Sequence, residues 1–202
     1  FVYDAAGNLQ EYIDPLGIIT RYDYDANDNL IRVTQAADTD DERTYNFDYN
    51  ELGQITTYTD PIGTITEYRY SRDNLVQVRQ PLGETEIATF YEYDLANNLV
   101  NIRLPHLVGE NPSAINLAYN ALNQRVRFTD TASNVWAYNY DNAGNLAQIS
   151  DPLGSITRYV YDAYDRLSQI ILPTDASVSY RYDIIGNLEE INLPPNAESD
   201  VQ

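Results

Sequence analysis

The chain has 202 residues, of which 43% are hydrophobic and 12% aromatic, and this composition argues against intrinsic disorder. Its 31 acidic and 12 basic residues give a net charge of −19, which disfavours nucleic acid and anionic lipid as partners and leaves cationic partners open. Cysteine is absent, which excludes disulfides and thiolate metal sites, and no apolar run approaches the roughly 18 residues that cross a bilayer.

One phrase, close to Tyr-Asp-x-x-Gly-Asn-Leu, recurs along the whole chain. Its nine copies follow one another at steps of 21 to 26 residues and begin at Tyr3, Tyr24, Tyr49, Tyr70, Tyr93, Tyr119, Tyr140, Tyr161 and Tyr182. A period of this length over the full sequence predicts a repeat architecture. We therefore predict a single array over residues 1–195 and a polar C-terminal tail over residues 196–202. Because Phe1 already lies inside a repeat, we expect the chain to be part of a longer array.

Each copy opens with a predicted turn, rich in Asp, Asn and Gly. Positions of the turn are numbered from the residue that follows the tyrosine, which is position 1. In eight copies position 4 holds Gly7, Asp28, Gly53, Asn97, Asn123, Gly144, Asp165 and Gly186. These residue types tolerate a positive φ, so position 4 is predicted to be left-handed. The copy that begins at Tyr70 is one residue shorter and still offers Asp73 and Asn74.

Two short strands and a second turn are predicted to follow, shown here for the copy that begins at Tyr140. The first strand starts at Leu146, and its next apolar residue comes three positions later, which suggests either a bulge or a strand with apolar residues on both faces. Residues 151–154, Asp-Pro-Leu-Gly, fit a type I turn; residues 14–17 repeat it, and residues 60–63 and 80–83 nearly do. Residues 156–161 then alternate as a strand does, with Thr157, Tyr159 and Tyr161 on one face.

The units together predict an all-β protein of roughly 18 strands. Open twisted sheets rarely exceed about ten strands without curling. The expected fold is therefore a tandem array of β-hairpins in a curved or spiralling antiparallel sheet, a section of a hollow β-shell or barrel. Open strand edges at both ends of such an array would pair with neighbouring repeats or with another copy.

The phrase Tyr-Asp-x-x-Gly-Asn-Leu, together with Asp-Pro-Leu-Gly and Thr-Arg-Tyr at this spacing, resembles the YD repeat of RHS proteins. That family includes bacterial RHS toxins, wall-associated proteins, shell components of insecticidal toxin complexes, and teneurins. The resemblance covers residues 1–195 and implies a spiral of β-hairpins that forms a hollow shell. In bacterial members such a shell encloses a toxic polypeptide, and in teneurins it is an extracellular scaffold.

The chain also departs from the family. The terminal core of the family carries a Pro-x-x-x-x-Asp-Pro-x-Gly-Leu motif beside a self-cleavage site. Here the Asp-Pro-Leu-Gly turns at 14–17 and 151–154 lack the following Leu and continue into further repeats. Autoproteolysis and toxin activity are therefore not expected of this segment.

Few residues are candidates for chemistry, and neither a catalytic residue nor a cofactor is predicted. His106, the only histidine, lies in an insertion between Pro105 and Pro112 without a matching nucleophile motif, and is interpreted as a loop residue. An acidic run in the second repeat comprises Asp38, Asp40, Asp41 and Glu42. It is interpreted as a solvated charge run, with binding of a hard cation such as Ca²⁺ as the alternative.

Repetition argues that the Tyr-Asp pairs are structural rather than the two carboxylates of a glycosidase. Exposed tyrosine faces leave weak glycan stacking open. Trp136, in the slot that usually holds Thr, is interpreted as a packing residue.

The sequence thus favours a non-enzymatic wall or scaffold segment of a secreted or surface protein, and we expect that protein to be bacterial. The full protein could enclose or present a polypeptide. Two alternatives stay open: an adhesion module for carbohydrate or protein, and a subunit of a self-assembling tube or filament.

Overall fold

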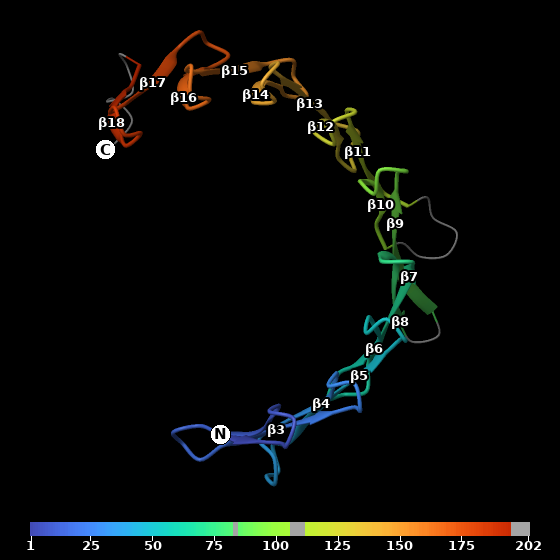
Figure 1. Cartoon of the computed structure of the whole chain (residues 1–202). Coiled ribbons are helices and arrows are strands. Elements are labelled where there is room, and N and C mark those ends of the chain that lie inside the picture. The colour runs from blue at the N-terminus through green and yellow to red at the C-terminus, as the bar shows by residue number, and fades with distance from the viewer. Residues whose placement is uncertain (83–84, 106–111, 195–202) are drawn as a thin grey trace. The chain divides into compact units, whose positions relative to one another are not determined.

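The computed structural model describes residues 1–82, 85–105 and 112–194 (Figure 1). Within these residues every regular element is a β-strand, and no helix that could cross a membrane is present. The bounds of the first nine are β1 Val2–Tyr3, β2 Leu9–Ile13, β3 Ile19–Tyr24, β4 Leu30–Gln35, β5 Arg43–Tyr49, β6 Ile55–Thr59, β7 Ile65–Ser71, β8 Asn74–Leu82 and β9 Thr85–Tyr93. The bounds of the others are β10 Leu99–Arg103, β11 Ala114–Tyr119, β12 Arg125–Thr129, β13 Val135–Tyr140, β14 Leu146–Ser150, β15 Ile156–Tyr161, β16 Leu167–Ile171, β17 Ser177–Tyr182 and β18 Leu188–Asn192.

The strands fall into two compact units. Unit 1 comprises Phe1–Glu92 and Ile102–Ser113, and unit 2 comprises Tyr93–Asn101 and Ala114–Gln202. Strands that follow each other in the sequence pair antiparallel, from β1 to β9 in unit 1 and from β11 to β18 in unit 2. The predicted all-β fold of tandem hairpins is confirmed.

A β-bulge at the start of each first strand explains the three-residue spacing of its apolar residues. In β14, Leu146 pairs with Tyr140 and Gln148 pairs with Asn139, so Ala147 is the extra residue. The extra residue places Leu146 and Ile149 on the same face of the sheet, although their spacing is odd. The same shift of register precedes the terminal tyrosine of β3, β5, β7, β11, β15 and β17. The predicted bulge is therefore confirmed.

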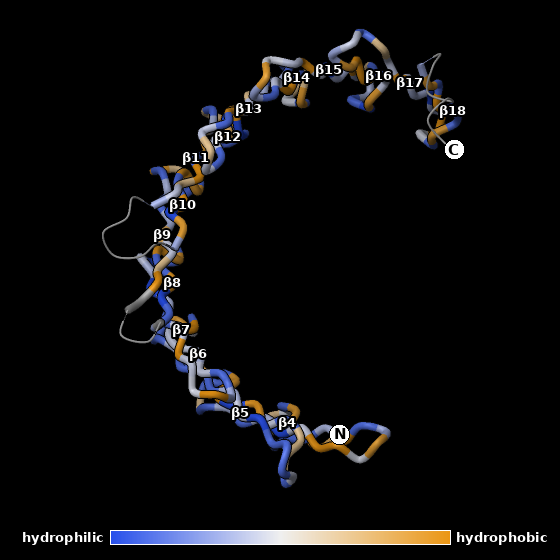
Figure 2. Tube along the Cα trace, turned by 180° about the vertical axis from the view of Figure 1, so that it is seen from behind, coloured by the Kyte–Doolittle hydropathy of each residue, from blue (hydrophilic) through white to orange (hydrophobic). Residues whose placement is uncertain are grey.

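In each unit the two faces of the sheet differ chemically. Side chains that neighbour each other across strands are mainly apolar on one face and mainly polar on the other. The apolar face of unit 1 carries Tyr12, Tyr22, Val33, Phe47, Tyr58, Tyr68 and Val78. The apolar face of unit 2 carries Leu117, Phe128, Trp136, Tyr138, Ile149, Tyr159, Ile170, Val178, Tyr180 and Ile191. Hydrophobic and hydrophilic positions accordingly interchange along the strands (Figure 2).

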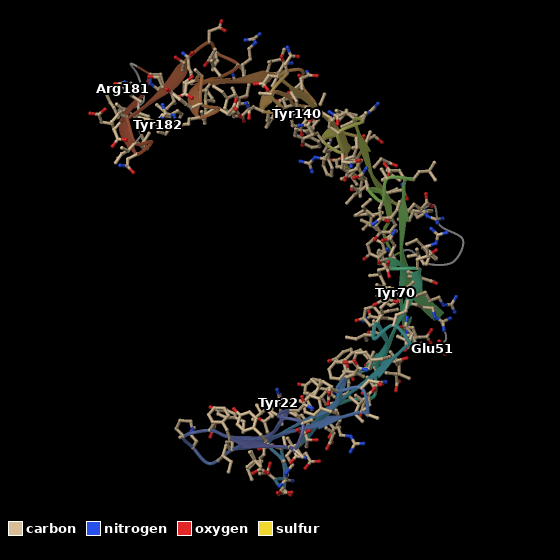
Figure 3. All side chains as sticks on the ribbon, viewed as in Figure 1. Tyr22, Glu51, Tyr70, Tyr140, Arg181 and Tyr182 are labelled. Carbon is tan, nitrogen blue, oxygen red and sulfur yellow. The ribbon has the colours of Figure 1, made fainter. Side chains whose placement is uncertain are left out.

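The opposite, polar face carries charged and amide side chains. In unit 1 it includes Glu11, Arg21, Arg32, Asn46, Glu67 and Arg79, and in unit 2 Arg127, Asn139, Gln148, Arg158, Gln169, Arg181 and Glu190. Arginine–carboxylate pairs cross neighbouring strands, for example Arg79 to Glu67 at 2.8 Å. In β17, Arg181 and Tyr182 project to opposite sides of the strand (Figure 3).

Neither face is covered by a second layer in the described residues. Among them only Ala37 and Thr66 are buried, and the side chains of the apolar face are half-buried by their neighbours on the same sheet. Stability must therefore come from contacts along the sheet rather than from a packed interior.

The left-handed positions agree with the prediction. All eight residues at position 4 have a positive φ, from 58° at Asp165 to 96° at Gly7. In the short copy the left-handed residue is Arg72, with φ 57°, rather than Asp73 or Asn74.

One predicted turn is wrong. Residues 80–82 lie inside β8, where Gln80 pairs with Ile87 and Leu82 pairs with Thr85. Residues 14–17, 60–63 and 151–154 begin with Asp, whereas residues 80–83 begin with Gln80, which lacks the carboxylate that closes the turn. Its side-chain amide instead donates to the Thr66 hydroxyl at 2.8 Å.

The left-handed turn can be tested at Gly63, where φ is +86° and an added Cβ would meet no heavy atom within 4 Å. Any loss of stability is then due to the backbone alone. We expect Gly63→Val to lower the free energy of unfolding by about 1–2 kcal/mol. Gly63→Asn is the matched control and should cost less, because Asn is left-handed at Asn97 and Asn123. Equal losses in urea unfolding would contradict this account.

Candidate functional site

The repeated aspartate of the first turn acts as an acceptor for the backbone of its own turn. Oδ1 of Asp141 accepts the N–H groups of Ala143 at 2.9 Å and Asn145 at 2.8 Å. The Gly144 N–H donates to the Asp141 carbonyl at 3.1 Å, which closes the turn. The same two contacts to one side-chain oxygen recur at Asp4, Asp25, Asn50, Asp94, Asn120, Asp162 and Asp183.

The second turn uses the same geometry. Oδ1 of Asp151 accepts the N–H groups of Leu153 at 2.9 Å and Ser155 at 2.7 Å, and Gly154 donates to the Asp151 carbonyl at 3.0 Å. Asp14, Asp60 and Asp130 repeat it. The type I turn predicted at residues 14–17, 60–63 and 151–154 is thus present, and both ends of a hairpin are closed by one device.

These hydrogen bonds favour the ionised carboxylate. The backbone N–H of Asn145 is the main cause that lowers the pKa of Asp141, and its side-chain amide adds to the effect. At Asp25, Asp94 and Asp183 the side-chain amide of the residue four positions on is the first cause of the lowered pKa. At Asp162 that role is taken by Arg166, which lowers the pKa of Asp162 through a hydrogen bond.

Positions 1 and 5 of the first turn form complementary pairs. Where position 1 is Asp, position 5 is Asn in every copy except that of Asp162, where it is Arg166. The Asn amide donates to the second carboxylate oxygen, as from Asn187 to Asp183 at 2.9 Å. Where position 1 is Asn, position 5 is Gln, and the hydrogen bond runs the other way, from the amide of position 1 to the side-chain oxygen of position 5. Nδ2 of Asn120 donates to Oε1 of Gln124 at 2.8 Å, and Asn50 donates to Gln54 in the same way.

Position 5 also reaches the first turn of the next copy. The short Asn side chain bonds a side-chain acceptor at the next position 4 where one is present, from Asn8 to Asp28, from Asn98 to Asn123 and from Asn145 to Asp165 at 2.8 to 2.9 Å. Asn29 instead lies beside Gly53, which offers no side-chain acceptor. The longer Gln side chain reaches a backbone carbonyl instead, from Gln54 to Arg72 and from Gln124 to Gly144. Successive repeats are therefore matched to each other in order.

In at least five copies the tyrosine that opens the phrase is hydrogen-bonded to the preceding hairpin. The Tyr161 hydroxyl donates to the Leu146 carbonyl at 3.1 Å, and burial raises the pKa of Tyr161, which keeps the hydroxyl protonated. The same bond runs from Tyr24 to Leu9, from Tyr49 to Leu30, from Tyr140 to Arg125 and from Tyr182 to Leu167. This acceptor was not predicted, because it depends on the register of the two strands.

The acidic run lies in the loop between β4 and β5. Arg21 binds Asp38 through two nitrogens at 2.8 and 2.6 Å and also donates to Glu11 at 3.1 Å. The hydrogen bonds from Arg21 lower the pKa of Asp38. Glu42 accepts the Asp38 N–H at 3.1 Å, whereas Asp40 and Asp41 are exposed. Within the part of the chain that the structure describes, no three His, Asp or Glu side chains are placed to hold a metal ion; cation binding by the run stays a prediction.

Two further residues, Trp136 and Arg125, contact aromatic rings. Trp136 packs against Phe128 with ring centroids 5.4 Å apart, as interpreted from the sequence. Arg125, which replaces Leu at the start of β12, lies over the rings of Phe128 and Tyr138 at 5.9 and 4.6 Å. His106 and the tail at 196–202 lie outside the described residues.

Two family models match the chain in separate parts. The Teneurin YD-shell model matches residues 107–201, and the RHS Repeat model matches residues 3–40 and 49–85. The chain is an array of RHS/YD repeats. The comparison with curated proteins finds no match for this RHS/YD array.

Solved structures share the fold of the RHS/YD array. The crystal structure of TcdB2-TccC3 without its hypervariable C-terminal region matches 98% of the array with a TM-score of 0.66 and 18% identity. The Photorhabdus luminescens Tc holotoxin pore matches 94% with a TM-score of 0.61 and 17% identity. The array spans only 12% and 13% of those two chains. At these identities the likeness concerns the fold alone.

The tyrosine bond can be tested with Tyr161→Phe. Loss of the hydroxyl leaves the Leu146 carbonyl without this donor, and we expect the free energy of unfolding to fall by about 0.5–1.5 kcal/mol. Tyr164→Phe is the matched control, because Tyr164 sits at a turn corner and is 79% exposed. Equal effects of the two changes in denaturant unfolding would show that the hydroxyl bond contributes nothing.

The aspartate turn predicts a loss of stability in acid. Because the pKa of Asp141 is lower in the folded state, its contribution is complete above the unfolded value of about 3.9 and is lost as pH falls through the folded value. The double variant Asp141→Asn/Asn145→Gln copies the pair at Asn120 and Gln124, which does not titrate. We expect its thermal midpoint near pH 7 to lie below that of the wild type, because the charge-assisted bonds of Asp141 and the bond from Asn145 to Asp165 are lost, and to fall less on acidification. Parallel curves from about pH 5 to about pH 2 would contradict this prediction.

Proposed function

We propose that the RHS/YD array is a non-enzymatic wall segment of an RHS-type β-shell, in a secreted or surface protein of bacterial type. The single observation that carries the proposal is that each unit has an apolar face with no cover in the described residues. A single-layer sheet with an uncovered apolar face is suited to separate two environments. The shared fold with the TcdB2-TccC3 structure supports the same role.

In the longer protein the apolar face would be the inner side of the wall, turned toward an enclosed or presented polypeptide. The polar face carries exposed charged and amide residues, such as Arg158, Asn139 and Arg181, and suits the outer, solvated side. The carboxylates at position 1 of the repeated turns accept backbone N–H groups, and those of Asp28 and Asp165 accept side-chain amides. A structural role therefore accounts for the repeated residues without any catalytic centre.

The two sides can be distinguished with single cysteines, because the chain contains none. Ile170→Cys places a thiol on the apolar face of β16, and Gln169→Cys places one on its polar face. In the full-length protein we expect a polymer-sized maleimide to modify the thiol at position 169 and to spare the one at position 170 until the protein is denatured.

The isolated 202-residue chain is the control, in which both thiols should react. Equal modification of the two positions in the native full-length protein would overturn the proposal, because the apolar face would then be open to solvent.

A further inference from the structure

Four of the five first turns of unit 2 expose large apolar side chains at their corners, positions 2 and 3, and the turn after Tyr140 carries Asn142 and Ala143 there instead. Leu95 is 110% exposed and Ile184 is 102% exposed at position 2. At position 3, Leu122, Tyr164 and Ile185 are 75%, 79% and 81% exposed. We name these five residues, with the turns that carry them, the first-turn rim of unit 2.

The fold does not require apolar residues at these corners. The corner residues of the turn point away from both strands, so nothing within the hairpin can cover them. Polar residues stand at some of these places: Asn142 at position 2 within unit 2, and Glu51 at position 2 and Asn27 at position 3 in unit 1, where Leu52 is a further exposed apolar corner. Exposed apolar groups that gather along one surface mark a site of interaction.

Hydrogen bonds join the rim into a continuous structure. Consecutive turns are joined from Asn98 to Asn123, from Gln124 to Gly144, from Asn145 to Asp165 and from Arg166 to the Asp183 carbonyl. Because two strands separate neighbouring first turns, their corners recur about every 10 Å. The spacing of the exposed side chains is therefore fixed by the sheet.

The rim is also negatively charged. Its turns carry Asp94, Asp141, Asp162, Asp165 and Asp183. The cation Arg166 lies among them, but it is engaged with Asp162 at 2.7 Å and with the Tyr182 ring at 4.6 Å. A partner of this rim should therefore be cationic as well as apolar.

We propose that the first-turn rim of unit 2 docks an extended peptide segment in which apolar residues recur every third position with Arg or Lys between them. A polyproline II helix has three residues per turn and rises about 3.1 Å per residue, so its equivalent side chains repeat about every 9.3 Å. This repeat matches the spacing of the turn corners. Anionic membranes and a second copy of this acidic rim are repelled by the same charge.

The test uses a fluorescein-labelled peptide of five Leu-Arg-Pro triplets and the 202-residue chain, with fluorescence anisotropy as the measurement. Leu122→Asn/Tyr164→Asn/Ile185→Asn installs the residue that position 3 already holds at Asn27. We expect the affinity of this variant for the peptide to fall by a factor of about ten or more. Leu153→Asn, at a second-turn corner that is 92% exposed, is the control and should bind as the wild type does.

Peptides with Glu in place of Arg, or Ser in place of Leu, should not bind, and salt at about 0.5 M should weaken the Leu-Arg-Pro peptide. Circular dichroism and the thermal midpoint establish that each variant is folded. If the triple variant does not fold, Leu95→Asn/Ile184→Asn is used as the rim variant in its place. Unchanged binding by a folded rim variant, or equal binding of the Glu peptide, would overturn the proposal. So would a wild-type dimer in sedimentation that the rim variant abolishes, because the occupant would then be a second copy.

Discussion

The hydrogen bonds that an aspartate makes to its own turn are the interaction on which the rest of this structure depends. A single-layer sheet has no second layer to hold its connections in place, so each turn must be stable by itself. The carboxylate of Asp141 or Asp151 does this by accepting two backbone N–H groups that the strands leave unpaired. Charge-assisted bonds of this kind are stronger than neutral ones. Because the same device closes both turns, it also sets the register that separates the apolar face from the polar face.

A second level of order arises between neighbouring copies. The residue at position 5 selects the acceptor that it reaches in the next copy: Asn145 bonds the side chain of Asp165, whereas the longer Gln124 reaches the Gly144 carbonyl. Arrays whose units contact only their neighbours owe their stability to such interfaces. The copies look alike in a consensus, but they are not interchangeable, because a copy moved to a new place would lose its matched partner.

How much the sequence could predict depends on how local each feature is. The left-handed residues at position 4, the bulges and the alternating strands follow from residues within one copy, so the sequence predicts them; the left-handed Arg72 of the short copy is the exception. The bond from Tyr161 to the Leu146 carbonyl joins residues fifteen apart and requires the strand register first. The turn expected at residues 80–83 is wrong although the consensus Pro-Leu-Gly is present. Gln80 stands where the other three turns have Asp, and the strands continue to pair as far as Leu82 and Thr85. The rim of unit 2 could not be predicted, because its exposed corners are aligned only by the sheet.

The preference for tyrosine follows from the uncovered face. The chain has 19 tyrosines against 4 phenylalanines. A half-exposed phenylalanine ring would leave only apolar surface in water, whereas tyrosine contributes its ring to the sheet and keeps its hydroxyl hydrogen-bonded. In Tyr49 and Tyr182 that hydroxyl bonds a backbone carbonyl at the strand end, so the ring is fixed without a covering layer. A face built in this way is stable while still wet. It can therefore enclose an interior whose contents are not part of its own fold, as the proposed shell wall requires.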